Sequence, residues 1–399
     1  MVTVDQPMLY PFAGDLSADS APELARLRAQ APLARVRLPD GQPAWLVLRY
    51  DDVKQVYSDR RFSREAATRP GAPSVSPSAA MPGMLIGLDP PEHTRIRRLV
   101  SRAFSARTID HKRPRIQQIV DELLAGLRDH GAPADLVSLF SYPLPLKVIT
   151  EILGVPYADR DQFRDVVAVV MASSAYPAER IRAAIDELVG YLTQLIERKR
   201  AEPDDSLLSA LVAARDGSDR LSEEELLHNA QLILVAGHDT TANFLSNSLV
   251  TLFRHPDQLA LLRQRPDLVP NAVEVLLRQV QLATAGLVRI ATEDVELSGV
   301  LVRAGEAVVP SGHAANSDPE AFPDIGRLDV TCTDTVPHLA FGYGPHHCVG
   351  AALARLELQT ALRTLLTRMP TLRLAVPADQ LRWRPGMLMR TLEELPVTW

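Results

Sequence analysis

Cys348 is the side chain best suited to chemistry in this sequence, because it stands in a glycine-rich stretch just before an apolar segment that begins at Ala351. A thiol between flexible backbone and the start of a helix is poorly placed for core packing but well placed to bind a metal as a thiolate. Unpaired N–H groups and the positive end of the helix dipole stabilise an anion there, so we expect the pKa of this thiol to fall. Gly342, Gly344 and Gly350 would let the backbone approach a flat, bulky group. The stretch predicts a thiolate ligand for a cofactor.

A second stretch capable of chemistry lies inside a long predicted helix. The pattern at 222–225, Ser-Glu-Glu-Glu, indicates a capping box, and the helix is expected to continue to about Arg254. Within it, positions 236–241 read Ala-Gly-His-Asp-Thr-Thr, so a glycine and two threonines interrupt good helix formers. We expect a bulge here that opens the backbone to a ligand or water. The alternative is that a buried Thr240 simply bonds the carbonyl four residues earlier.

A third set of candidates combines positive charge with helical spacing. His93 and Arg97 stand four residues apart, so both lie on one face of the helix that Asp89 is expected to cap. Two cationic donors that converge on one side suit a buried pair of carboxylates, and a solvated basic face is the alternative interpretation. Further basic residues follow as far as Arg115, on a protein whose formal net charge is −6. An acidic electron donor could dock on this basic region.

The cysteine stretch resembles the ligand loop of the cytochrome P450 family of haem-thiolate monooxygenases, written F-G-x-G-x-H-x-C-x-G. The residues that match its fixed positions are Phe341, Gly342, Gly344, His346, Cys348 and Gly350. The stretch at 236–241 is similar to the family's oxygen-binding groove, A-G-x-D-T-T. The resemblance extends over nearly the whole chain. It implies one haem b per chain, held between the helix that contains Thr240 and the helix that follows Cys348.

The resemblance also implies roles for individual residues. Cys348 would be the iron ligand, and Thr240 and Asp239 would be the catalytic pair that binds dioxygen and relays protons. Cations from distant segments would bind the haem propionates, while small residues and the cysteine loop would enclose the porphyrin. Beyond Cys348, the cofactor-binding residues implied in this way are His93, Arg97, Arg289, His346, Phe341, Gly342, Gly350, Ala236 and Gly237.

One helix departs from the family pattern. The E-x-x-R motif that ends at Arg278 has Val275 where the glutamate should stand, and Glu274 lies one residue early, about 100° around the helix. Arg327 matches the family's second arginine. Position 275 therefore offers no carboxylate for the two arginines to share. We expect Arg278 to contact backbone carbonyls, another acid or water, because an uncompensated buried charge is costly.

The expected substrate pocket is apolar. The loop at 63–85 contains four prolines, and its apolar residues from Met81 onward could form an adaptable wall, with a plain surface loop as the alternative. Segment 163–178 would cover the active site if the family architecture holds. For the return at 383–390, core packing is the alternative. The residues predicted to contact substrate are Met84, Leu85, Leu232, Val235, Ala236, Leu287, Val288, Met387 and Leu388.

Composition indicates one globular unit with no general affinity for nucleic acid, since 46% of the 399 residues are hydrophobic and 23% are charged. Two cysteines do not make a disulfide framework and fit a reducing cytoplasm. Neither a signal peptide nor a membrane anchor is expected. The resemblance implies a mainly α fold, a triangular helix-rich lobe with a small β-rich lobe. The expected single domain covers 1–399, with helices at 90–282 and 350–368 and strands mainly at 30–60, 283–312 and 370–399.

By the same resemblance the protein would be a cytoplasmic, monomeric monooxygenase of the soluble actinomycete type. It would use O2 and two electrons from a ferredoxin and its reductase to hydroxylate or epoxidise a medium-sized, largely apolar molecule such as a secondary metabolite. Oxidative C–C or aromatic coupling in natural-product biosynthesis, and non-catalytic haem binding, are the alternatives. A zinc hydrolase using His346, His347 and Cys348 is a further one, although adjacent side chains diverge and no second ligand cluster completes a tetrahedron.

Overall fold

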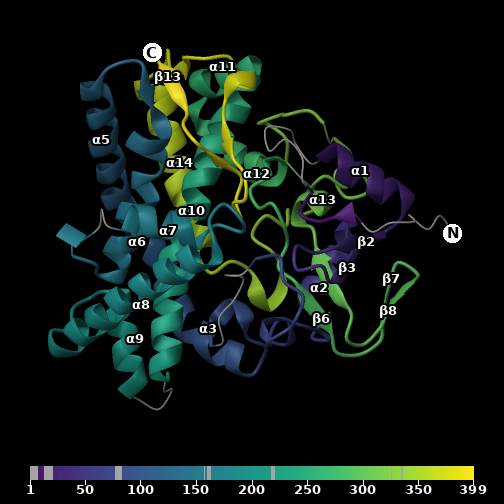
Figure 1. Ribbon diagram of the computed structural model, residues 1–399. Coiled ribbons are helices and arrows are strands. Elements are labelled where there is room, and N and C mark those ends of the chain that lie inside the picture. Colours follow the sequence, from purple (N-terminus) through teal and green to yellow (C-terminus); the bar gives the residue numbers. More distant parts are fainter. Residues whose placement is uncertain are drawn as a thin grey trace.

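The computed structural model describes residues 8–12, 21–76, 83–156, 158–159, 163–216, 221–324, 326–333 and 336–399. Met81, suggested by the sequence for the substrate wall, lies outside the described residues. The chain forms a larger helical part and a smaller part built on a β-sheet, which lie side by side in Figure 1. This arrangement confirms the predicted fold class.

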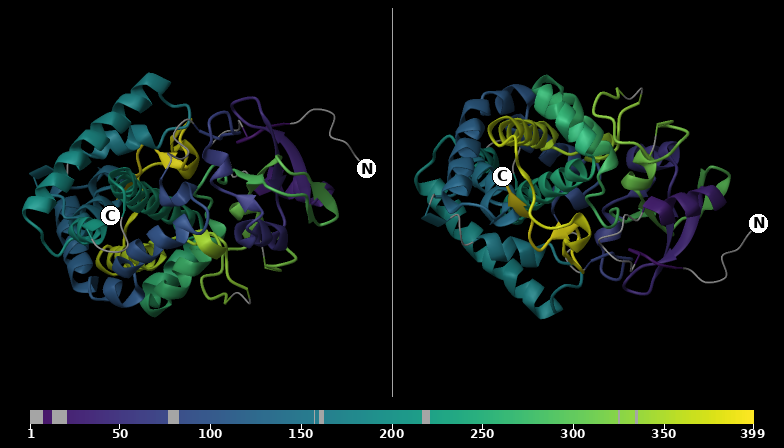
Figure 2. Two further views of the ribbon diagram at one scale, coloured as in Figure 1. Left: turned by 90° about the horizontal axis from the view of Figure 1, so that it is seen from below. Right: turned by 90° about the horizontal axis from the view of Figure 1, so that it is seen from above.

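Long helices make up most of the larger part. Helix α10 runs through its middle and is surrounded by other helices in the views from below and above (Figure 2). The helices of this part are α3 (Glu92–Ala103), α4 (Ala106–Asp110), α5 (Arg113–His130), α6 (Pro143–Leu153), α7 (Phe163–Val170), α8 (Ala178–Ala201), α9 (Leu207–Asp216), α10 (Glu223–Arg254), α11 (Pro256–Gln264), α12 (Val269–Gln279) and α14 (Ala351–Arg368). Their buried faces share one apolar core. Within the described ranges, every helix is too short or too polar to span a bilayer.

Helix α10 begins as the sequence predicted. The hydroxyl of Ser222 accepts the N–H of Glu225 at 3.0 Å, and the carboxylate of Glu225 accepts the N–H of Ser222 at 2.8 Å, which completes a capping box. The bulge expected at 236–241 is wrong, because α10 is a continuous α-helix across these residues. The glycine and the threonines at 236–241 therefore have to be explained by what each of them contacts.

Gly237 marks the close contact between α10 and α6. A Cβ built on this glycine would lie 2.8 Å from the side chain of Ile149, closer than real Cβ atoms approach. Glycine therefore lets the two helices pack against each other. This packing explains why position 237 is a glycine, and no cofactor is needed for that explanation. The preceding residue, Ala236, is exposed.

The smaller part is organised around a six-stranded sheet with the order β1-β2-β3-β9-β6-β4. Its strands are β1 (Met8–Leu9), β2 (Leu33–Arg37), β3 (Pro43–Val47), β4 (Phe62–Ser63), β6 (Arg289–Ala291) and β9 (Ala307–Pro310). Strands β2 and β3 pair antiparallel and form a hairpin. Buried residues of β3 and β9 divide between two apolar clusters, so both faces of the sheet are covered. The part is completed by α1 (Ala21–Gln30), α2 (Tyr50–Ser58), α13 (Gly312–Asn316), β7 (Val295–Leu297) and β8 (Val300–Val302).

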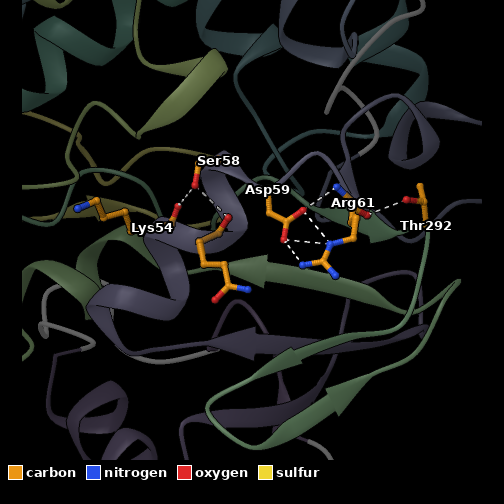
Figure 3. Close-up of polar contacts among 6 residues, drawn as sticks. Lys54, Ser58, Asp59, Arg61 and Thr292 are labelled. Atoms are coloured by element: carbon orange, nitrogen blue, oxygen red, sulfur yellow. Dashed lines mark hydrogen bonds and ion pairs between the residues drawn. The ribbon is translucent and has the colours of Figure 1, made fainter.

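A polar turn joins α2 to β4 and ties β4 to β6, the strand that begins with Arg289. Figure 3 shows the turn: the hydroxyl of Ser58 donates to a carbonyl one helical turn earlier at 2.9 Å, and the guanidinium of Arg61 pairs with Asp59 at 2.6 Å. Thr292, which follows β6, donates through its N–H and its hydroxyl to the carbonyl of Arg61 at 2.8 and 3.0 Å. These bonds extend the pairing of β4 with β6 beyond the last paired residues, Phe62 and Ala291.

The C-terminal segment returns to the helical part. Strands β11 (Trp383–Arg384) and β12 (Thr391–Leu392) form a hairpin, and β10 (Arg373–Leu374), β13 (Pro396–Thr398) and β5 (Ala134–Asp135) form a small sheet. The carbonyl of Gly386 accepts three consecutive N–H groups, from residues 173 to 175, at 2.8, 3.0 and 3.0 Å. Gly386 has φ 71°, and its Cβ would lie 2.5 Å from the nitrogen of Ala175, so only glycine fits. This contact fastens the loop between α7 and α8 to the hairpin.

Candidate active site

Two histidines and two arginines that are far apart in the sequence, called here the cation cluster, come together beside the cysteine loop. His93 and Arg97 belong to α3, Arg289 begins β6, and His346 ends a short 3-10 helix, η6 (Gly344–His346). The rings of His93 and His346 lie 4.3 Å apart. The charges of Arg97 and Arg289 act on both histidines. The fold therefore assembles the four residues that the resemblance assigned to the propionates.

This cation cluster lacks enough negative charge of its own. Burial, followed by the charge of Arg97, lowers the pKa of His93 to about 4, and burial with the charge of Arg289 lowers the pKa of His346 to about 2. Burial also lowers the pKa of Arg97 and of Arg289. Two buried donors, Nε2 of His93 and Nε of Arg289, have no hydrogen-bond partner among the described residues. Such donors are costly to bury unless they bind an acceptor, so the cluster fits the two carboxylates of a haem.

Arg64 is a further member of this region that sequence reasoning missed. Its side chain is buried; Nε donates to the carbonyl of Ile86 at 3.1 Å, and Nη1 donates to the carbonyl of Val288. Burial, with the charge of Arg289, lowers the pKa of Arg64 to about 9, and Arg64 in turn helps to lower the pKa of His346. An isolated arginine in a loop has no periodic signal, so only the tertiary fold could reveal it.

Asp89 does not cap α3 as predicted. The N-cap of α3 is Pro91, and no side chain bonds to the first turn of the helix. The carboxylate of Asp89 instead accepts the N–H of Arg64 at 3.0 Å and the hydroxyl of Ser63. Asp89, just before α3, therefore holds the segment that contains Arg64 close to this helix. In this way it helps to position the cation cluster.

Cys348 is a free cysteine whose residue is exposed, and its N–H donates to the carbonyl of Phe341 at 2.8 Å. A Cβ on Gly350 would lie 3.9 Å from the sulfur, so the glycine keeps the space beside it open. The predicted fall in the thiol pKa is wrong. Desolvation by the surrounding protein raises the pKa of Cys348, and the N–H of Gly350 and the charges of Arg97 and Arg355 oppose the rise only in part. A metal bound to the sulfur would favour the thiolate form.

The other glycines of the loop serve turns and packing. Gly342 and Gly344 have φ 70° and 68°, a region that residues with a Cβ rarely adopt. A Cβ on Gly344 would lie 2.8 Å from the carbonyl oxygen of Tyr57, so this glycine lets the loop pack on the end of α2. This packing explains why position 344 is a glycine, so the contact with a flat group that the sequence suggested is not needed to explain it. Among the described residues, a Cβ built on Gly342 would have one neighbour within 4 Å, the carbonyl oxygen of His346 at 3.8 Å.

Asp239 and Thr240 are neighbours on α10 with different surroundings. Asp239 is 2% exposed, its Oδ2 has no hydrogen-bond partner among the described residues, and burial raises the pKa of its carboxyl to about 7, with Asn243 and Arg384 opposing the rise. The hydroxyl of Thr240 donates to the carbonyl of Ala236 at 2.7 Å, as the alternative interpretation predicted, yet Thr240 is only partly buried. The pair presents a hydroxyl oxygen that can accept a hydrogen bond and a carboxyl able to give or take a proton near neutral pH.

The residues predicted to contact substrate have different environments. Leu287 is 38% exposed, Ala236 is exposed, and Leu232 and Leu388 are partly buried. Those that the structure buries are Met84, Leu85, Val235, Val288 and Met387. Leu85, Val235 and Met387 join the helical core, and Val288 joins a core on the sheet, so packing accounts for these four.

A cavity of about 790 Å³ lies between the α7–α8 loop and the β11–β12 hairpin. It is lined by residues 174–176 on one side and by 382, 384–387, 393 and 394 on the other, including Met387. Arg382 pairs with Glu393 at 3.1 Å and with Glu394 at 3.2 Å, so much of the charge at the cavity is compensated. The loop within 163–178 therefore lines one side of this cavity. That segment 163–178 covers the active site stays a prediction.

The departure at position 275 is accommodated by an aromatic ring. Val275 and Arg278 are each 2% exposed, and the guanidinium of Arg278 lies 4.9 Å from the centroid of the Phe322 ring. This ring contact differs from the backbone carbonyls, acid or water expected as partners of Arg278. Arg327, the residue that matched the family's second arginine, is exposed.

Comparison with known proteins agrees with this geometry, because the family model for cytochrome P450 matches residues 31–379. The chain belongs to the cytochrome P450 family. Nocardicin C N-oxygenase of Nocardia uniformis subsp. tsuyamanensis is 51% identical over 392 residues, 98% of each chain. Mycinamicin IV hydroxylase/epoxidase of Micromonospora griseorubida is 45% identical over 399 residues, 100% of each chain. The crystal structure of cytochrome P450mel 107F1 with biaryl coupling reactivity matches with a TM-score of 0.92 at 40% identity, covering 99% of this chain and 100% of that one.

As a cytochrome P450 the protein is a monooxygenase that takes a haem-thiolate iron cofactor, a substrate, O2 and a redox partner. When bound, the haem supplies one-electron and oxygen chemistry, which no protein side chain provides. The residues present fit this group, since a free thiol stands beside an open glycine and two unpartnered buried donors stand in the cation cluster. The zinc alternative has no ligand set, because no group of three or more His, Cys, Asp or Glu side chains in the described ranges could hold a metal.

Proposed function

We propose that this P450 binds haem b through the thiolate of Cys348 and the cation cluster, and oxygenates a medium-sized, largely apolar secondary metabolite. The observation that carries the proposal is the convergence of unpartnered buried donors beside a free thiol. Asp239 and Thr240 favour an enzyme over a non-catalytic haem protein. A protein that only holds haem has no use for a buried carboxyl with a pKa of about 7 next to a hydroxyl.

The size and lining of the 790 Å³ cavity support the substrate class. Its volume lies within the range of about 300–1,000 Å³ that small-molecule pockets occupy. Met387 provides apolar surface, while the polar residues around it favour a substrate that carries polar substituents on its apolar skeleton. Two relatives are named for N-oxygenation and for hydroxylation or epoxidation, which supports oxygen insertion. Oxidative coupling is the second candidate, supported by the likeness to a P450 with biaryl coupling reactivity.

We propose a ferredoxin as the electron donor and a cytoplasmic location. Exposed arginines on and between α3 and α5, on a protein of formal net charge −6, support docking of an acidic partner. These are Arg98, Arg102, Arg107 and Arg113. The two free cysteines agree with a reducing compartment.

The reduced carbon-monoxide spectrum tests the cofactor assignment. Protein produced with ample iron and porphyrin precursor should give the red-shifted Soret band of a thiolate-bound haem, and Cys348→Ala should lose it. Cys332→Ala is the matched control, because it removes the other cysteine and should leave the band unchanged. A thiolate band that survives Cys348→Ala, or wild-type protein that holds no haem, contradicts the proposal.

A substrate screen tests the second half of the proposal. Natural products with an apolar skeleton and polar substituents should shift the spin state of the iron on binding, and turnover with a ferredoxin system should add one oxygen atom, measured by mass spectrometry. Products that are dimers or have lost two hydrogen atoms would favour the coupling candidate instead.

A further inference from the structure

Glu274 of α12 bonds to two residues at opposite ends of the cysteine loop. Its carboxylate accepts Nε of Arg355 at 2.7 Å and Nη2 of Arg355 at 2.8 Å, a bidentate ion pair. It also accepts Nε2 of His338 at 3.1 Å. Bidentate, charge-assisted bonds of this kind fix geometry as well as adding energy. One carboxylate therefore holds His338, before the loop, and Arg355, near the start of α14.

Cys348 lies between these two anchors and is bonded within the loop. Its N–H donates to the carbonyl of Phe341 at 2.8 Å, and its carbonyl accepts the N–H of Ala351 at 3.4 Å. The ring nitrogen Nδ1 of His338 accepts the N–H of Ala340 at 3.3 Å, so Nε2 carries the proton that His338 donates to Glu274. The anchors at both ends thus limit how far the segment from 338 to 355 can move.

Arg355 also packs on the loop between the two anchors. Its guanidinium lies 4.6 Å from the centroid of the ring of Phe341, the residue whose carbonyl accepts the N–H of Cys348 at 2.8 Å. Burial opposes ionisation of Glu274, but the bonds from His338 and Arg355 outweigh it and lower the pKa of Glu274 to about 2. Glu274 is therefore charged at neutral pH and compensates the positive charge of Arg355.

We propose that Glu274 is a positioning residue for the cysteine ligand, which fixes the loop from both ends and balances the charge of Arg355 beside the sulfur. This inference rests on the proposed haem-thiolate function. It differs from the role of the glutamate missing at position 275, because the partner of Glu274 is Arg355 and not Arg278. Without the carboxylate, the charge of Arg355 acts on the sulfur and iron uncompensated. Positive charge favours the reduced iron, which carries one positive charge fewer.

The test is Glu274→Gln, measured by redox titration of the haem-loaded protein with soluble mediators. The midpoint potential should shift upward, and the Soret band of the reduced carbon-monoxide complex should move relative to wild type. Arg355→Leu should shift the potential downward, and Glu274→Gln should raise the potential less in the Arg355→Leu background than in wild type, because the two residues act as a pair. Haem retention during gel filtration should fall in Glu274→Gln.

Glu306→Gln is the matched control. Glu306 also accepts several donors, Arg35 at 2.7 Å, the Trp45 indole at 2.9 Å and the N–H of Arg303 at 2.9 Å, but it stands directly before strand β9 of the six-stranded sheet. It should leave the potential unchanged. If Glu274→Gln does not load haem, His338→Gln gives a second measurement of the midpoint potential. Because this variant keeps a donor to Glu274, we expect its potential to change little.

The outcomes separate this inference from the proposed function. Wild-type protein without a thiolate-bound haem refutes the proposed function. Wild-type protein with such a haem, combined with Glu274→Gln and Arg355→Leu variants whose potentials and Soret bands match wild type, overturns the role of Glu274 alone. An equal shift in Glu306→Gln also overturns it, because the effect would then follow from any lost surface charge.

Discussion

The hydroxyl of Thr240 donates to the carbonyl oxygen of Ala236 at 2.7 Å, inside a helix that continues unbroken past both residues. Since a hydroxyl has one proton, this bond leaves the oxygen of Thr240 as an acceptor for any further partner. Ala236 is exposed and Thr240 is partly exposed, so a ligand can approach the oxygen from their side of α10. A threonine whose only role was structural would not need this access.

Replacing Thr240 tests this acceptor. Thr240→Val keeps the shape and removes the hydroxyl, and we expect product formed per electron pair to fall at least roughly tenfold, a conservative share of the about 100- to 10,000-fold that positioned acid–base groups contribute. Hydrogen peroxide should rise correspondingly. Thr240→Ser is the control, since it keeps the oxygen and should retain most of the coupling. Peroxide yields that are equal in the two variants would rule out the hydroxyl as the group responsible.

Asp239 should give the protein a characteristic pH dependence. Its pKa is about 7 in the folded protein and 3.8 in an unperturbed aspartate, so the folded state holds the proton more tightly than the unfolded chain. The stability from this group is therefore present below about pH 4 and is lost as pH rises to about 7, by at most roughly 4 kcal/mol at 1.36 kcal/mol per pKa unit.

The Asp239→Asn variant removes this titration. Chemical denaturation between pH 5 and pH 8 should show that the variant gains stability relative to wild type as pH rises, and that the gain levels off above pH 7. In Arg384→Gln, the loss of a positive charge that lowers the pKa of Asp239 should move the transition to higher pH. Parallel pH profiles for wild type and Asp239→Asn would show that Asp239 does not titrate in this range.

A carboxylate at position 275 should stabilise the protein. Arg278 is buried, and Val275 stands three residues earlier on the same helix, so Val275→Glu places a carboxylate within one turn of the guanidinium. We expect Tm to rise by a few degrees and haem occupancy to increase. Val275→Gln, similar in size but neutral, should not give this gain. A lower Tm in Val275→Glu than in Val275→Gln would mean that the contact with Phe322 and the rest of the surroundings already suit Arg278.

Asn229 should control the rigidity of the wall formed by Met84 and Leu85. The side chain of this buried residue of α10 accepts the N–H of Leu85 at 2.9 Å and donates to the carbonyls of Gly83 at 3.0 Å and Glu225 at 2.7 Å. The segment is thus fixed to α10, one and two turns from Leu232 and Ala236, and is not the adaptable wall that the sequence suggested.

Asn229→Ala should therefore destabilise the protein by about 1–3 kcal/mol, at roughly 1 kcal/mol per hydrogen bond, and weaken discrimination among related substrates in spin-state titrations. Asn271→Ala is the control, because Asn271 ties a different loop to α12 through the carbonyls of Val330 and Cys332 at 2.8 and 2.9 Å. It should cost similar stability and leave discrimination intact. Equal effects of the two variants on discrimination would exclude a specific role for Asn229.

Short-range features of this protein could be predicted from sequence because each depends on neighbouring residues. The capping box at Ser222, the β2–β3 hairpin and the helix after Cys348 follow from local hydrogen bonding and hydrophobic periodicity. The thiolate loop could be predicted for a similar reason, since its glycines and cysteine lie within a few residues of each other. The cap assigned to Asp89 was wrong because its carboxylate accepts donors about 25 residues earlier in the chain.

Only the tertiary structure decided which charges meet and how strongly burial acts on them. Residue types identified Cys348, Asp239 and the cation cluster as candidates, but desolvation, which raises the thiol and carboxyl pKa values, depends on atoms contributed by segments hundreds of residues apart. The same holds for the inclusion of Arg64 in the cation region and for the pairing of Glu274 with Arg355 across 81 positions. Electrostatic free energy depends on distance in space and on exclusion of water, and neither is a property of sequence order.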